Sequence, residues 1–169
     1  MKTFDEIFST ECVKEEYQHA FLLNLFSKLC NRMNRDQSLK MELRKLFRQT
    51  KNKNDTVKWI VEQNFGYSMD SSETHYFQML LEAHFKMTGA RKKITNLEKE
   101  DLYKKQQGRC ASCGEELGVD YSKIHADHIV PWKYVGDELK NNLQLLCCDC
   151  NESKSCNTNY MFLKLIGLK

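Results

Sequence analysis

The sequence predicts an α+β protein in two parts, an all-helical N-terminal region and a smaller C-terminal region of short strands, turns and helices. Five of the seven glycines and the only proline follow residue 100, so the first 90 residues indicate nearly uninterrupted helix. Six of the eight cysteines lie between positions 110 and 156, which marks the C-terminal part as chemically distinct. We place the boundary near residue 92, giving domains at 1–92 and 93–169.

Four helices are expected before this boundary, because apolar residues recur there at three- and four-residue steps. Asp70 with Glu73 has the pattern of an N-terminal cap, while Gly66 and Gly89 are suited to end helices. The expected helices cover residues 13–33, a segment that follows Asp36, residues 55–65, and a segment from about 71 to 89.

The C-terminal part begins after a short basic segment at 91–93. Thr95 and Glu98 have the spacing of a capping box, which predicts a helix over about 96–107. Short apolar runs at 124–129 and 143–147 predict two strands, and a further helix is expected from about residue 150.

Two Cys-x-x-Cys pairs are the most specific chemical signal. Cys110 pairs with Cys113 and Cys147 with Cys150, and 33 residues separate the pairs. Two such knuckles can direct four thiolates at one Zn²⁺ ion and leave it no open position, so we predict one structural zinc. A redox pair or chemically unrelated thiols are the alternatives. Cys148 could replace Cys147, but only Cys147 keeps the two-residue gap.

Three motifs lie between and after these pairs: Asp127-His128-Ile-Val-Pro131, Asn142-Leu-Gln-Leu-Leu-Cys147 and Cys150-Asn-Glu-Ser-Lys154. In order and spacing they resemble the HNH nuclease family, over about residues 97–156. The resemblance implies a fold of two strands and a helix around a metal, and a divalent-metal-dependent endonuclease that hydrolyses phosphodiester bonds.

Phosphodiester hydrolysis requires a base that deprotonates water and a cation that stabilises charge on the phosphate. A histidine is available as a neutral imidazole near pH 7, and oxygen ligands suit Mg²⁺ or Mn²⁺. The resemblance makes His128 the general base, Asp127 and Asn151 the ligands of one catalytic Mg²⁺ or Mn²⁺, and Asn142 the residue that holds the backbone around His128. Asn151 stands where many family members have histidine, and Lys154 could hold the phosphate.

One alternative to these assignments stays open, and one geometric condition applies to them. The cysteines alone would also suit a non-catalytic zinc module that binds nucleic acid, whereas Asp127, His128, Asn142 and Asn151 are needed only by an enzyme. Adjacent strand residues point to opposite faces, so Asp127 and His128 can share a metal site only where the strand bends.

A basic stripe in the helical region offers a second contact with nucleic acid. Lys40, Arg44 and Arg48 lie four residues apart on one expected helix face and could neutralise phosphates. A solvated helix surface or a homodimer platform would explain the stripe equally well. We expect a double-stranded DNA substrate and a restriction, defence or phage role. With no signal peptide or long apolar run in the sequence, we expect cytoplasmic localisation and no membrane partner.

Overall fold

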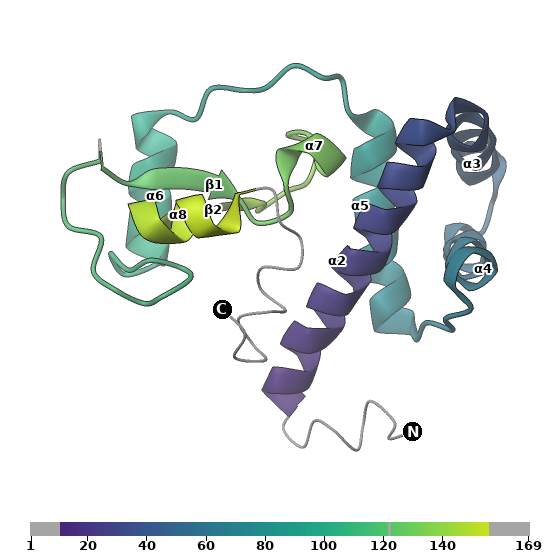
Figure 1. Ribbon diagram of the computed structural model, residues 1–169, viewed down its shortest axis with the longest axis horizontal. Helices are drawn as coiled ribbons and strands as arrows, with labels where there is room; N and C mark the ends of the chain where they lie inside the picture. The colour runs from purple at the N-terminus through teal and green to yellow at the C-terminus, as the bar shows by residue number, and fades with distance from the viewer. Residues whose placement is uncertain (1–10, 122, 156–169) are drawn as a thin grey trace.

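The computed structural model describes residues 11–121 and 123–155 of the chain (Figure 1). Cys156 and the side chains of residues 11–16, including Cys12 and Val13, lie outside this description. The helices are α2 (Glu11–Arg35), α3 (Gln37–Gln49), α4 (Lys53–Phe65), α5 (Ser71–Lys86), α6 (Asn96–Lys105), α7 (Trp132–Val135) and α8 (Cys148–Lys154). The strands are β1 (His125–His128) and β2 (Leu143–Leu146), so the predicted α+β class is confirmed.

The N-terminal helices begin and end largely where their capping residues predict. The side chain of Asp36 accepts from the backbone N–H of Leu39 and caps α3, and Asp70 and Glu73 form a complete capping box on α5. Gly66 ends α4 in the left-handed conformation, at φ 64°. Helix α5 ends at Lys86, not at Gly89, because the backbone leaves the helical conformation at Met87, with φ −51° and ψ 127°.

One cluster of buried hydrophobic residues joins the N-terminal helices to the loop after β1. Phe26 and Phe77 lie at its centre, where their rings meet edge to face at 5.8 Å. Val130, Tyr134 and Val135, which follow the predicted boundary, belong to the same cluster of buried residues. The loop after β1 is therefore anchored on the helical core, while the division into domains at residue 92 stays a prediction.

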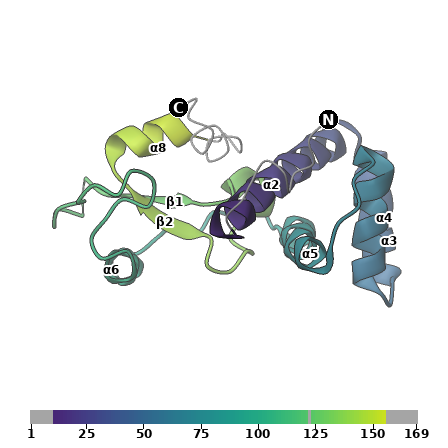
Figure 2. The ribbon, with the colours of Figure 1, turned by 90° about the horizontal axis from the view of Figure 1, so that it is seen from below.

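The two strands form an antiparallel hairpin in which Asp127 pairs with Gln144 and His128 with Leu143. Helix α8 lies against β1 on one side, and α6 lies on the other side against β2 (Figure 2). Helix α7 has no counterpart among the predicted elements, since a single turn after Pro131 is too short to show an apolar period.

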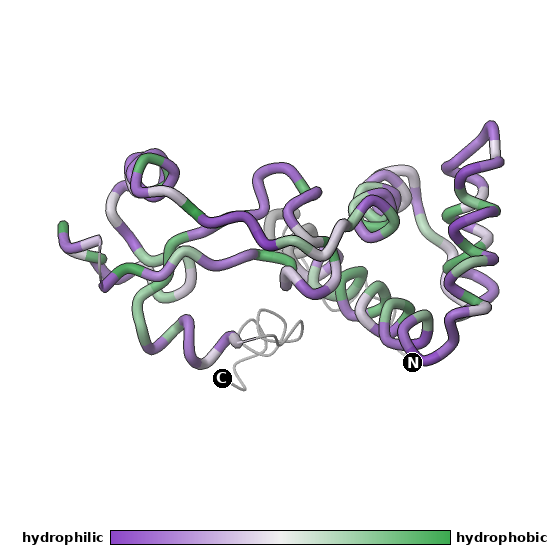
Figure 3. Tube along the Cα trace, turned by 90° about the horizontal axis from the view of Figure 1, so that it is seen from above, coloured by the Kyte–Doolittle hydropathy of each residue, from purple (hydrophilic) through white to green (hydrophobic). Residues whose placement is uncertain are grey.

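Hydrophilic and hydrophobic residues alternate along the helices, and the connection between α5 and α6 is hydrophilic at its basic residues 91–93 (Figure 3). Among the described residues, no helix combines the length and the apolar character needed to cross a membrane.

Candidate functional site

The structure brings the four predicted cysteines together at one end of the hairpin. Cys110 and Cys113 lie on the turn that follows α6, and Cys147 and Cys150 lie at the start of α8. All four sulfur atoms lie within 4.8 Å of one another, and the Cys113 and Cys147 sulfurs are 3.9 Å apart. A tetrahedral ion with Zn–S bonds of ~2.3 Å needs sulfurs about 3.8 Å apart, so the donor set fits zinc.

Backbone N–H groups prepare one of these sulfurs to act as a thiolate. Burial raises the pKa of Cys110, but the N–H groups of Ser112 and Cys147, each 3.4 Å from its sulfur, help to lower the pKa to about 7. Burial and the neighbouring cysteines raise the pKa of Cys147 to about 12. Zinc binding at this cluster would therefore release protons, as expected for a thiolate site.

His128 ends β1 and is buried, with 4% of its surface exposed. Its Nε2 atom lies 3.2 Å from Oδ1 of Asp137. Its Nδ1 atom is also buried and has no hydrogen-bond partner among the described residues. One ring nitrogen thus faces a carboxylate, and the other is buried without a hydrogen-bond partner among the described residues.

Asn142 is buried and holds the loop that follows His128. Its Oδ1 accepts from the backbone N–H of Val130 at 2.7 Å, and its Nδ2 donates to the Val130 carbonyl at 2.9 Å. The Asn142 carbonyl also accepts from the backbone N–H of Ile129 at 2.9 Å. The side chain therefore satisfies both backbone groups of a buried residue two positions after His128.

The Asp127 carboxylate contacts side chains of α8 and β2. Its Oδ2 lies 2.7 Å from Nζ of Lys154 and accepts from Nε2 of Gln144 at 3.3 Å. Lys154 is 3% exposed, and its Nζ also donates to the His128 carbonyl at 2.7 Å. This buried ion pair fastens α8 to the end of β1.

The residues predicted to hold a catalytic cation are oxygen donors on β1 and α8. Both hydrogen-bonded contacts of Asp127 use Oδ2, so Oδ1 is the oxygen left for a cation. Asn151 is half-buried in α8, three residues before Lys154. Mg²⁺ is commonly held by one or two protein oxygens together with waters and phosphates, and this donor set fits that pattern.

Comparison with known families adds to this geometry. Residues 110–157 match the HNH endonuclease family. The resemblance inferred from the motifs is confirmed for this HNH segment, which contains the four cysteines, the hairpin and α8. No curated protein and no solved structure matches the chain.

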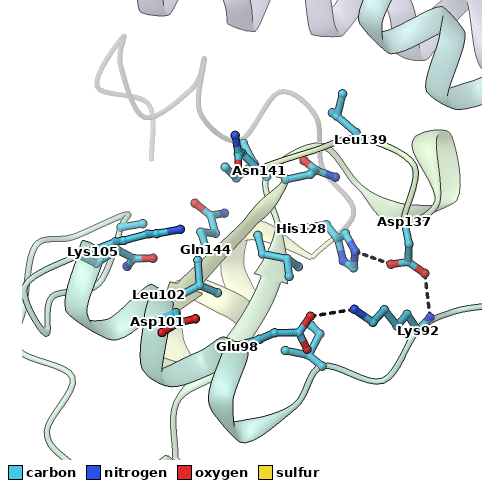
Figure 4. A pocket seen from close by; sticks show the side chains of 16 residues that line it. Lys92, Glu98, Asp101, Leu102, Lys105, His128, Asp137, Leu139, Asn141 and Gln144 are labelled. Carbon is cyan, nitrogen blue, oxygen red and sulfur yellow. Dashed lines mark hydrogen bonds and ion pairs between the residues drawn. The ribbon is translucent and has the colours of Figure 1, made fainter.

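A cleft of about 780 Å³ opens beside the hairpin of the HNH segment, on the side of α6 (Figure 4). His128 and Asp137 line it, as do Asn142 and Lys92. Asp127 and Asn151 are not among its lining residues. The cleft therefore borders the buried histidine from one face of the hairpin, whereas the two predicted cation ligands do not line it.

Asp137 is a residue of this site that the sequence motifs did not indicate. Partial burial would raise its pKa, but hydrogen bonds from the Lys92 backbone, the Trp132 indole and His128 outweigh burial and lower it. Lys92 N lies 2.7 Å and Trp132 Nε1 3.1 Å from Oδ2. Asp137 belongs to no HNH motif quoted above, and its position nine residues after His128 carried no recognisable signal.

The predicted basic stripe lies on α3, far along the chain from the HNH segment. Arg44 is half-buried, and its Nη2 donates to the carbonyl of Phe85 near the end of α5 at 2.8 Å. Arg48 is exposed and Lys40 is half-buried. Arg44 thus has a structural contact, and the binding of phosphates by these three residues stays a prediction.

Proposed function

We propose that this chain is a divalent-metal-dependent endonuclease that hydrolyses phosphodiester bonds in DNA. The observation that carries the proposal is the buried, unpartnered Nδ1 of His128 within the HNH segment. His128 borders the cleft, and a neutral imidazole can take a proton from a water molecule that attacks phosphorus.

The other predicted residues have roles that follow from their contacts. Asp127 and Asn151 would hold Mg²⁺ or Mn²⁺, which when bound stabilises charge on the phosphate and on the leaving oxygen. Asn142 keeps the backbone after His128 in place through Val130. Lys154 holds α8 against β1 and places a positive charge beside Asp127, while the binding of a phosphate by Lys154 stays a prediction.

We extend the proposal to double-stranded DNA and to a restriction, defence or phage function. Support comes from the combination of an HNH segment with a helical region whose α3 presents Arg48 and neighbouring basic residues to solvent. Such side chains bind the phosphate backbone without reading its sequence. A homodimer would bring two sites to two strands.

Cleavage of supercoiled plasmid tests the proposal. Wild type with added Mg²⁺ or Mn²⁺ is expected to nick or linearise the plasmid, and His128→Ala is expected to be inactive while keeping its zinc and its fold. His75→Ala is the matched control, because His75 is exposed on α5. Equal cleavage by wild type and His128→Ala would refute the role of His128 as the base.

One observation favours the alternative of a non-catalytic zinc module that binds nucleic acid. Lys154 already neutralises Asp127, the residue that an enzyme would use to hold its cation. A module of this kind would bind DNA or RNA with or without Mg²⁺ and would cleave neither. Cleavage that requires the added metal therefore separates the two functions.

A further inference from the structure

Asp137 contacts His128 through one carboxylate oxygen and the surrounding backbone through the other. Oδ1 lies 3.2 Å from His128 Nε2, while Oδ2 accepts from Lys92 N and Trp132 Nε1. An ionised carboxylate can only accept hydrogen bonds, so the contact requires a proton on Nε2 of His128. The pKa of Asp137 is lowered by its hydrogen bonds, which keeps this carboxylate ionised near neutral pH.

We propose that Asp137 is a positioning residue that fixes the Nε2–H tautomer of His128 and leaves Nδ1 as the nitrogen that accepts the proton. This role rests on the proposed nuclease function. The opposite tautomer would place a buried N–H at Nδ1, where no described residue can accept it, and would set two acceptors against each other at Nε2. Both nitrogens therefore favour the same tautomer.

The backbone before Asp137 and its packing against the helical region constrain the turn that carries this carboxylate. Gly136 precedes it at φ 59° and ψ −143°, a conformation in which a side chain is strained. A Cβ added to Gly136 would lie 2.7 Å from Cγ of Met87, so the turn packs directly against the residue that follows α5. With two donors on Oδ2, only Oδ1 is free to meet His128.

Two substitutions of Asp137 separate positioning from structural support. Asp137→Asn keeps the size and shape of the side chain. When its amide oxygen accepts from Lys92 N and Trp132 Nε1, its NH₂ group faces His128 Nε2. An NH₂ donor at Nε2 would move the ring proton to Nδ1, which is the tautomer that the proposal excludes. Asp137→Glu keeps the carboxylate but fits less well. If Asp137 has only a structural role, Asp137→Asn should be more active than Asp137→Glu. If Asp137 positions the imidazole, Asp137→Glu should be the more active of the two.

Kinetics on a plasmid or oligonucleotide substrate supply the first measurement, with the full chain loaded with zinc and supplied with Mg²⁺. Because general-base catalysis commonly contributes ~10²–10⁴-fold, we expect Asp137→Asn to lose about 100-fold in kcat with KM within about threefold of wild type. Glu138→Gln is the matched control, since Glu138 is the exposed neighbouring acid. It is expected to behave as wild type.

Nitrogen-15 NMR of the histidine rings supplies a second measurement that does not need activity. The His128 signals are assigned by their loss in His128→Ala. Wild type is expected to show Nε2–H with an unprotonated Nδ1, and Asp137→Asn the reverse. Nδ1–H in wild type, or full kcat in Asp137→Asn, would overturn the proposal. If wild type cuts no substrate but the tautomer switches, the nuclease function fails while the orienting role of Asp137 stands.

Discussion

Replacing Asn142 with alanine tests how much one side chain contributes to the loop after His128. In the folded protein the Asn142 amide pairs with both the N–H and the carbonyl of Val130, at 2.7 and 2.9 Å. Asn142 is 5% exposed and Val130 is 2% exposed, so water has little access to these groups. Alanine would leave a buried donor and a buried acceptor without partners.

The expected loss follows from these two groups. A buried polar group left unpaired costs ~1–3 kcal/mol, so two of them give about 2–6 kcal/mol of lost stability. Typical domains are stable by only ~5–15 kcal/mol, so Asn142→Ala would lose a large share of the total. Since Val130 is part of the core, the loss should also loosen the end of β1 at His128.

Urea unfolding of the zinc-loaded protein, followed by circular dichroism, measures this loss. Asn141→Gly is the matched control, because Asn141 is exposed with φ 56°, a value that glycine adopts without strain. The control is expected to stay within about 0.5 kcal/mol of wild type. A loss below about 1 kcal/mol in Asn142→Ala would show that Val130 finds other partners and would refute the reasoning.

Three further changes have defined outcomes. Cys110→Ser should abolish the single zinc measured by mass spectrometry, whereas Cys148→Ser, an exposed cysteine outside the cluster, should keep it. Gly136→Ala should cost about 1–3 kcal/mol of backbone strain plus about 1–3 kcal/mol of overpacking against Met87, so its melting temperature should fall below that of Gly118→Ala, whose Cβ would meet no atom within 4 Å. Burial lowers the pKa of His84, so the unfolded state binds its proton more readily, and stability should fall as pH drops below about 6.5. A His84→Gln variant whose stability depends on pH as wild type does would contradict this.

The sequence predicted the parts of the fold that depend on near neighbours. Capping residues such as Asp70 act on backbone groups three residues away, and the glycine that ends α4 acts at its own position. The zinc cluster was predictable for the same reason, since each Cys-x-x-Cys knuckle is a local turn. Only the proximity of the two knuckles depends on the tertiary structure. The sequence still favoured that proximity, because one zinc ion shared by both pairs was the simplest interpretation.

Tertiary contacts determined what the sequence did not predict. Lys154 has the pattern of a solvated or phosphate-binding lysine, yet α8 places it in a buried ion pair with Asp127. Adjacent strand residues are expected to point to opposite faces, and the contacts of Asp127 and His128 are consistent with this, because Asp127 contacts Lys154 and His128 contacts Asp137. Arg44 similarly has a backbone carbonyl of α5 as its partner, which no periodicity on α3 reveals.

The orientation of His128 depends both on the local motifs and on tertiary contacts. Val130, Tyr134 and Val135 are buried in the helical core, which fixes α7 and the turn that follows it. That turn presents Asp137, and the Lys92 backbone, 45 residues earlier in the chain, donates to the same carboxylate. The motif residues thus supply the imidazole and the oxygen donors within a short segment. The direction of the imidazole depends also on the helical region and on the connection between α5 and α6. For this reason the isolated HNH segment would lack groups that orient its own histidine.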